Sequence, residues 1–283
     1  MPAANAVIEA AWGKPVRHTA ALSGGCISDV RLVEFADGTR AVAKLAQGPS
    51  TFLTEAWMLD YLKSHSALPV PAVLHAADNI LLLEYLESGG ALDGRAQAHA
   101  AELLAALHKI SASRYGLERD TVIGSLRQPN RETDSWIDFF REQRLLYMAG
   151  KALDEGAIHG RLMSRIESLA ARIEEFLEEP ESPSLVHGDV WGGNVLCKDG
   201  RITGFIDPAI YYADPEIELA FSTLFSTFGD SFFAGYRELH GIRDGFFETR
   251  RDIYNLYPLL VHVRLFGGGY VGSVEATLQR FGF

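Results

Sequence analysis

The alternation of apolar and polar residues changes character about one third of the way along the chain. Before residue 88 the apolar runs are short and alternate with polar positions, which is typical of half-buried strands. Asp37-Gly38 lies between two such runs and favours a hairpin turn. We therefore expect strands over residues 16–22, 29–35, 40–45 and 79–85, a loop and strand over residues 69–74, and helices over residues 5–11 and 51–62.

After residue 88 the apolar positions recur with helical spacing. In residues 94–110, for example, Ala101, Leu104, Ala105 and Leu107 share one face. The expected helices cover residues 94–110, 134–149, 160–179, 217–228, 231–240, 246–266 and 272–280. Residues 185–208 interrupt them with two apolar runs around a polar loop, which predicts a single embedded β-hairpin.

Lys44 and Glu55 suggest how the two parts of the chain work together. Lys44 lies among small apolar residues on the third expected strand, and Glu55 follows in the next expected helix. A strand Lys paired with a helix Glu is how protein kinases position the α- and β-phosphates of ATP. In isolation, an exposed strand Lys and a solvated Glu are equally ordinary interpretations. The pair favours a bilobal α+β kinase-like fold, with residues 1–87 as a small β-rich N-lobe and 88–283 as a larger helical C-lobe.

Three oxygen-bearing side chains in residues 185–208 predict phosphoryl-transfer chemistry. Asp189 and Asn194 have the spacing of the kinase catalytic loop, and Asp207 follows in Ile-Asp-Pro. We expect Asp189 to accept the proton of a substrate hydroxyl, and Asn194 and Asp207 to bind Mg²⁺, which prefers hard oxygen ligands. Ordinary turn residues are the alternative, since Asp, Asn and Gly are common in turns.

Two further segments are candidates for binding the nucleotide. Backbone N–H groups around Gly24, Gly25 and Cys26 are expected to cover its phosphates, although a plain Gly-Gly turn explains the same residues. Glu84, Tyr85 and Leu86 precede a Gly89-Gly90 break that we interpret as the hinge, where backbone groups would pair with adenine.

Composition narrows the class of protein. The chain has 283 residues, 47% of them hydrophobic, with a net charge of -11 and two cysteines. An acidic balance argues against a general nucleic-acid binder. Two cysteines are too few for a disulfide framework. With neither a secretory signal nor a long apolar run in the sequence, we expect a cytoplasmic protein with no membrane partner.

The sequence resembles the fructosamine kinase family, a branch of the aminoglycoside-phosphotransferase-like kinases. The motifs that carry the resemblance are His187-Gly-Asp-Val-Trp-Gly-Gly-Asn194 and Ile206-Asp-Pro-Ala-Ile-Tyr-Tyr212, with Trp191 as the discriminating residue. Two segments depart from the family pattern: residues 125–127, and Ala213-Asp-Pro-Glu216. Both are expected near the acceptor side of the site.

The resemblance implies ATP- and Mg²⁺-dependent phosphorylation of the 3-hydroxyl of a ketoamine, free or protein-bound, after which the product decomposes and frees the amine. It places Trp191, His187 and Tyr211 at the substrate, although Trp191 could instead pack the catalytic loop. It also implies a redox role for Cys26 through an intermolecular disulfide, so that the protein is a monomer or a redox-dependent homodimer. An inert thiol is the competing interpretation for Cys26.

Two alternative functions remain open from the sequence. One is another small-molecule kinase of the same fold, acting on an aminoglycoside, choline or homoserine. Trp191 and the Tyr211-Tyr212 context argue against it. The other is a nucleotide-binding pseudokinase that serves as an interaction module. The complete set of Lys44, Glu55, Asp189, Asn194 and Asp207 argues against that function.

Overall fold

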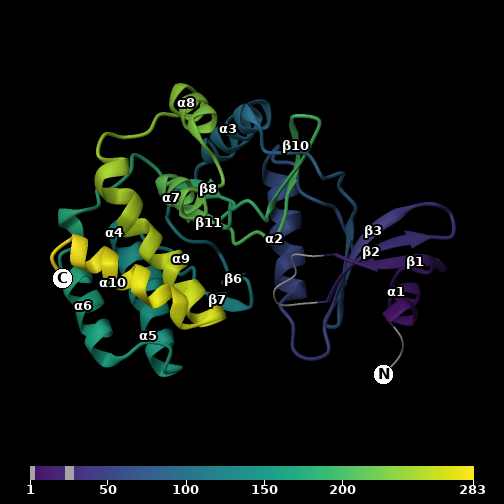
Figure 1. The fold of residues 1–283 in the computed structure, drawn as a ribbon, viewed down its shortest axis with the longest axis horizontal. Coiled ribbons are helices and arrows are strands. Elements are labelled where there is room, and N and C mark those ends of the chain that lie inside the picture. The colour runs from purple at the N-terminus through teal and green to yellow at the C-terminus, as the bar shows by residue number, and fades with distance from the viewer. Residues whose placement is uncertain (1–3, 23–28) are drawn as a thin grey trace.

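The computed structural model describes residues 4–22 and 29–283, which form two lobes side by side (Figure 1). The N-terminal lobe is built on a five-stranded antiparallel sheet in the order β1-β2-β3-β5-β4. Its strands are β1 (Val16–Ala21), β2 (Asp29–Phe35), β3 (Arg40–Leu45), β4 (Val73–Ala77) and β5 (Ile80–Glu84). All five expected strands are present, although β4 begins at Val73 and extends to Ala77, three residues beyond the expected end of its apolar run at residue 74.

Two helices complete the N-terminal lobe. Helix α1 (Ala4–Trp12) inserts Ile8 into a small core with Val33, Phe35 and Leu82 of the sheet. Helix α2 (Phe52–His65) packs against β4 and β5 and belongs to the main core through Met58 and Leu62. Helix α2 also contacts the C-terminal lobe, so it lies between the lobes (Figure 1).

The C-terminal lobe is mainly helical, as the sequence predicts. Its α-helices are α3 (Gly94–His108), α4 (Trp136–Phe139), α5 (Tyr147–Asp154), α6 (Gly160–Ala170), α7 (Glu216–Leu224), α8 (Asp230–Leu239), α9 (Arg251–Phe266) and α10 (Val271–Arg280). Short 3-10 turns follow at η2 (Ile173–Glu175) and η4 (Gly268–Tyr270). Helix α6 ends at Ala170, nine residues before the expected boundary at residue 179. The expected helix is too long because the apolar spacing continues through the 3-10 turn η2 to the buried Leu177.

Two expected helices contain π-helical turns that the apolar spacing does not reveal. The segment expected over 134–149 is divided by η1 (Phe140–Leu146), and the segment over 246–266 begins with η3 (Phe246–Arg250). Each π-turn contains a buried arginine, Arg144 or Arg250. A π-turn widens the helix by one residue per turn and re-aims side chains, which is a common device near functional sites.

The prediction that the two apolar runs of residues 185–208 form one β-hairpin is wrong, because each run pairs with a different strand. Strand β8 (Ser184–Val186) pairs with β11 (Tyr211–Ala213), and β9 (Val195–Lys198) pairs with β10 (Arg201–Phe205). The two apolar runs do not pair with each other. The β9–β10 hairpin is an excursion from the β8–β11 pair, so the loops after β8 and before β11 lie together. A third small sheet joins β6 (Thr121–Ile123) and β7 (Leu126–Gln128).

The chain passes between lobes at residues 85–93, next to the β9–β10 hairpin. Thr203 donates from Oγ1 to the carbonyl of Glu87 at 2.5 Å, and Gly90 N donates to the carbonyl of Cys197 at 2.9 Å. Cys197 is buried in β9. The boundary at residues 87/88 stays a prediction. Within the described ranges, every helix is too short or too polar to cross a bilayer.

Candidate active site

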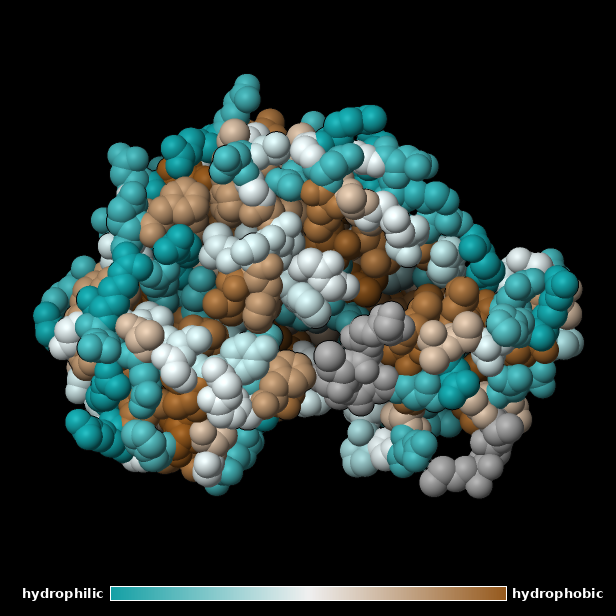
Figure 2. Space-filling model, in the orientation of Figure 1, coloured by the Kyte–Doolittle hydropathy of each residue, from teal (hydrophilic) through white to brown (hydrophobic). Residues whose placement is uncertain are grey.

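An open cleft of about 1280 Å³ lies between the lobes. Its lining includes Lys44 and Glu55 from the N-terminal lobe and Asp189, Asn194 and Asp207 from the C-terminal lobe. The outer rim of the molecule is mainly hydrophilic, and a notch opens between the two lobes in this view (Figure 2). Five residues chosen from three separate stretches of sequence therefore meet in one cavity.

Lys44 joins the two lobes at the centre of this cleft. Its Nζ donates to Glu55 Oε1 at 2.6 Å and also to Asp207 Oδ1. Burial alone would lower the pKa of Lys44, but the charges of Asp207 and Glu55 more than offset this, so its pKa is raised above the ordinary value. Lys44 is therefore a permanent cation. The predicted Lys–Glu pair is present, and it extends to the acid that we assign to Mg²⁺.

Asp189 and Asn194 form the second part of the site. Asn194 Nδ2 donates to the Asp189 carboxylate at 2.8 Å and to its carbonyl at 2.9 Å, which orients the amide oxygen away from Asp189. Burial raises the pKa of Asp189 to about 8, and the nearby charge of Asp207 adds to this effect. A cation bound at Asp207 would remove that contribution and favour the ionised form that accepts a proton.

The backbone around these residues is held in uncommon conformations. Asp207 has φ 55°, which non-glycine residues rarely adopt, and such strain clusters at functional sites. Gly188 has φ 87°, and a Cβ there would lie 2.1 Å from the carbonyl oxygen of Ala209. Ala209 N in turn donates to the carbonyl of His187 at 2.7 Å. The loops of Asp189 and Asp207 are thus in direct backbone contact.

We expect Gly188→Ala to reduce kcat by about 10²-fold, because the new Cβ must push the two loops apart and small displacements of reacting groups are costly. Steady-state kinetics and thermal unfolding would measure the effect. Gly150→Ala is the matched control, since a Cβ added to that helical glycine would meet open space. A Gly188→Ala enzyme as active as Gly150→Ala would contradict the prediction.

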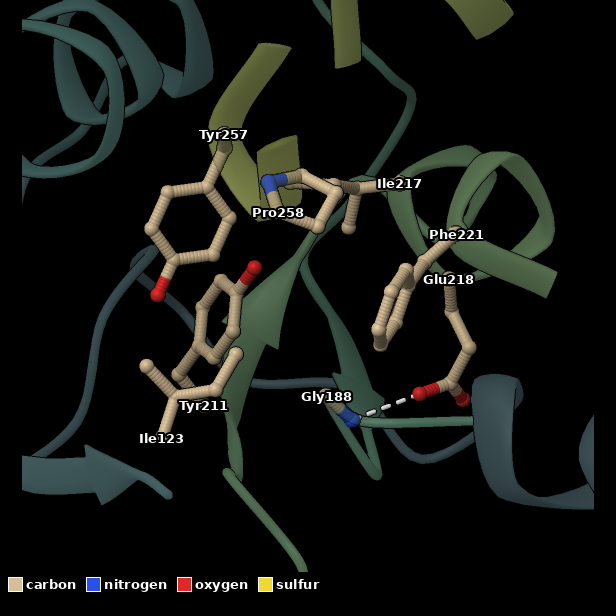
Figure 3. Close-up of a pocket in the computed structure, with 8 residues that line it drawn as sticks. All are labelled: Ile123, Gly188, Tyr211, Ile217, Glu218, Phe221, Tyr257 and Pro258. Carbon is tan, nitrogen blue, oxygen red and sulfur yellow. Dashed lines mark hydrogen bonds between the residues drawn. The ribbon is translucent and has the colours of Figure 1, made fainter. Parts of the chain in front are cut away.

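A buried carboxylate that was not among the predicted site residues, Glu218, binds the backbone of the loop just before Asp189. Glu218 on α7 accepts from Gly188 N at 2.6 Å (Figure 3). The same carboxylate accepts from His187 N at 3.3 Å. It also contacts His108 Nε2 at 2.8 Å, and His108 Nδ1 lies 2.6 Å from the hydroxyl of Tyr236. Burial raises the pKa of Glu218, but the hydrogen bond and charge of His108 outweigh it, so the pKa is lowered overall. His108 therefore has a structural role in the core of the C-terminal lobe.

His187 and Tyr211 are not exposed to the cleft, which corrects their assignment to the substrate. His187 is completely buried, with its ring next to Phe205. The Tyr211 ring is buried beneath the guanidinium of Arg144 at 3.9 Å and faces Tyr257 across a cavity of about 10 Å³ (Figure 3). His187 comes shortly before Asp189 in the sequence and Tyr211 comes shortly after Asp207, but the side chains of both point into the core.

The structure describes one of the two candidate nucleotide-binding segments, Glu84 to Leu86, and not the other. Gly24, Gly25 and Cys26 lie outside the described residues, so the phosphate cover and the redox role of Cys26 stay predictions. The Glu84 side chain accepts from Ala72 N at 3.0 Å, and the Tyr85 ring packs under Arg40 at 4.1 Å.

The third hinge candidate, Leu86, packs against Gly204 of the β9–β10 hairpin. None of the three described hinge candidates is part of the cleft lining, so an adenine role for their backbone also stays a prediction.

Trp191 does line the cleft, two residues beyond Asp189. A Cβ added to Gly193 would lie 2.4 Å from the indole, so the ring lies against the backbone of the catalytic loop. The edge of the ring meets Phe225 at a centroid distance of 6.0 Å. Trp191 therefore packs the loop and borders the cavity, and both interpretations of this residue have a structural basis.

The two departures from the family pattern differ in position. Of residues 125–127, Ser125 lines the cleft at the β6–β7 turn, and its place on the acceptor side stays a prediction. Asp214 and Glu216 instead lie in a buried ion-pair network. Glu216 accepts from Arg250 Nε at 2.6 Å and from Arg243 at 2.9 Å, and Asp214 accepts from the hydroxyl of Tyr254 at 2.7 Å. These acids stabilise the C-terminal lobe and do not touch the cavity.

The donor set at the base of the cleft fits Mg²⁺. Mg²⁺ is usually held by one or two carboxylates together with phosphate oxygens and waters, rather than by a full cage of side chains. Asp207 and the amide oxygen of Asn194 supply such a partial set. The described residues contain no group of three or more His, Cys, Asp or Glu side chains that could cage a metal.

The two lobes and the Lys44–Glu55–Asp207 arrangement define a kinase fold. An aminoglycoside phosphotransferase solved with ADP and hygromycin B has a TM-score of 0.69 over 99% of both chains, at 16% sequence identity, which shows the fold alone. A crystal structure assigned as a fructosamine-3-kinase from Thermobifida fusca agrees better, with a TM-score of 0.87, 30% identity, and coverage of 99% of this chain and 98% of that one.

The sequence comparisons identify the family. The family model described as Fructosamine kinase matches residues 1–281. A protein named as a probable ketoamine kinase from Synechocystis sp. is 32% identical over 283 residues, which is 95% of this chain and 92% of that protein. A chloroplastic protein-ribulosamine 3-kinase from Oryza sativa subsp. indica is 31% identical, covering 95% of this chain and 80% of its own length. The chain belongs to the fructosamine kinase family.

Proposed function

We propose that this protein is an ATP-dependent kinase that phosphorylates the 3-hydroxyl of ketoamines, the adducts of a sugar with an amine, and thereby leads to release of the amine. The observation that carries the proposal is the meeting of Lys44 and Glu55 with Asp189, Asn194 and Asp207 in one cleft. Membership of the fructosamine kinase family supports the choice of acceptor.

Each residue has a role that its geometry supports. Asp189 accepts the proton of the attacking hydroxyl, and Asn194 fixes the orientation of its carboxylate. Lys44 holds the α- and β-phosphates, with Glu55 orienting its ammonium group. Mg²⁺ bound by Asp207 and Asn194 would neutralise charge on the phosphates. Phosphoryl transfer depends mainly on such positioning and electrostatic stabilisation.

The proposal divides the work between the lobes. Residues 1–87 bind the nucleotide phosphates, and residues 88–283 supply catalysis and the acceptor site. The intact set of five residues argues against a pseudokinase, which typically lacks part of this constellation. A related kinase acting on aminoglycosides or choline would use the same five residues, so the acceptor must be tested directly.

A coupled ADP-release assay over four acceptors tests the proposal. Ribuloselysine and fructoselysine are the two ketoamines, and an aminoglycoside and choline represent the alternatives. We expect Mg²⁺-dependent turnover with at least one ketoamine, with a kcat/KM at least about 10²-fold above that of the other acceptors. Turnover of the aminoglycoside or choline without any ketoamine would overturn it.

A further inference from the structure

A continuous row of aromatic rings lines one side of the cleft. It consists of Phe225 after α7, His262 and Phe266 on α9, and Tyr270 in η4, and we call these four residues the aromatic wall. The centroid of the His262 ring lies 5.0 Å from that of Phe225, 5.4 Å from Phe266 and 4.9 Å from Tyr270. Trp191 meets the wall at Phe225, so the row begins beside the catalytic loop.

The wall exposes apolar surface that a folded protein usually buries. Phe225 is 37% exposed and Phe266 is 49% exposed. Among the large hydrophobic side chains that the structure describes as exposed, these two are the aromatic ones, and both line the cleft. Exposed apolar surface gathered in a cavity indicates ligand binding rather than chance.

The distribution of charge along the cleft is uneven. The charged residues of its described lining are Asp29, Lys44, Glu55, Asp189 and Asp207. None belongs to the wall, whose other neighbours in the lining are Val261 and Leu265. A ligand that lies along the wall therefore finds aromatic and aliphatic contacts but, among the described lining residues there, no cation to pair with a carboxylate.

His262 adds one polar acceptor to the wall. Its Nδ1 lies 2.7 Å from the carbonyl oxygen of Pro258, which can only accept, so Nδ1 carries the proton. Burial lowers the pKa of His262, which keeps the ring neutral at pH 7. Its Nε2 then has a lone pair, and no hydrogen-bond partner for this atom lies among the described residues.

We propose that the aromatic wall binds the amine substituent of the ketoamine and selects adducts whose nitrogen carries an aliphatic chain, such as the side chain of a lysine. This inference rests on the proposed function. With the reacting hydroxyl at Asp189 and the sugar next to Trp191, the wall is the surface that continues from the sugar along the cleft. The wall selects against adducts with a carboxylate next to the nitrogen.

The chemistry of a ketoamine suits each component of this surface. Its nitrogen is a secondary amine that is largely protonated at neutral pH, and aromatic faces attract such cations. The Nε2 lone pair of His262 can accept one of its N–H groups. The methylene groups of the chain would lie against Phe225 and Phe266, where each methylene removed from water contributes to binding.

Three adducts of one sugar, ribulose, test the inference by kcat/KM: those of methylamine, hexylamine and glycine. We expect the hexylamine adduct to exceed the methylamine adduct by about tenfold, within the range that apolar pockets give for added methylenes. The glycine adduct should be the poorest of the three. In Phe225→Ala/Phe266→Ala the hexyl-to-methyl ratio should fall to about one, mainly through KM for the hexylamine adduct.

Leu239→Ala is the matched control, because Leu239 is 42% exposed, ends helix α8 and is not part of the cleft lining. It should keep the wild-type ratio. Equal kcat/KM for the hexylamine and methylamine adducts in the wild-type enzyme would overturn the inference while leaving the proposed function intact, as would an unchanged ratio in the double variant. Failure of the wild-type enzyme to use any of these adducts or the ketoamines of the acceptor panel would overturn both.

Discussion

Replacing Asp189 with Asn is expected to lower kcat by about 10²- to 10⁴-fold, the usual contribution of a positioned general base. Asn has the shape of Asp and can still accept from Asn194 Nδ2, which lies 2.8 Å from the Asp189 carboxylate. What it loses is the ability to take the proton of the acceptor hydroxyl. Nucleotide affinity should change by less than about threefold, since Asp189 holds no phosphate in the proposed mechanism.

Single-turnover kinetics with a ketoamine, together with calorimetric titration of nucleotide, would separate these two effects. Asp199→Asn is a suitable control: Asp199 lies in the β9–β10 turn with φ 53°, a conformation that Asn tolerates well. It should behave like the wild-type enzyme. A near-normal kcat in Asp189→Asn would remove Asp189 from the catalytic role.

Replacing Asp207 with Asn should abolish most of the gain in nucleotide affinity that Mg²⁺ provides. Asn keeps the positive φ of 55° with little strain, so the substitution isolates the carboxylate charge. Loss of a supporting residue alone typically costs about 10- to 100-fold in metal affinity, and we expect at least this for a direct ligand.

The measurement is nucleotide Kd with Mg²⁺ and with EDTA for both proteins. We expect the two values to differ widely in the wild-type enzyme and to converge in Asp207→Asn. Lys44 also loses one of its two carboxylate partners in this variant, but keeps Glu55 at 2.6 Å. A Mg²⁺ effect of wild-type size in Asp207→Asn would exclude Asp207 as a ligand.

The sequence predicts which five candidate residues come together because their spacing follows short motifs. The spacing of Asp189, Asn194 and Asp207 and the Lys44–Glu55 pair follow from residue type and order, and all five residues line one cleft. The motifs do not show which of their side chains are buried in the folded protein. His187 and Tyr211 belong to the same motifs as the reacting residues, yet both are inside the core.

Residues that act across long sequence separations are the ones that sequence reasoning missed. Glu218 is an acid within an apolar helix, and this mismatch is a signal that a buried partner exists. His262 and Phe266 are four residues apart and share a face of α9, and Tyr270 follows in η4 after the helix ends at Phe266. Nothing in the sequence connects that face to Phe225, because helix α9 meets α7 only in the folded lobe.

The β9–β10 hairpin lies in the sequence between the paired strands β8 and β11, and this order determines where the chain can be lengthened without moving the site. Ile206 N donates to the carbonyl of Asn194 at 3.0 Å, so a backbone hydrogen bond closes the base of the hairpin formed by residues 195–205. The geometry of Asp189, Asn194 and Asp207 is defined at that base and in the β8–β11 pair. The tip of the hairpin at Asp199-Gly200 is thus decoupled from the chemistry and is a natural place to insert a foreign peptide or a fluorescent reporter. One residue added between Asp207 and Tyr211 would instead shift the ladder and turn its side chains to the opposite face.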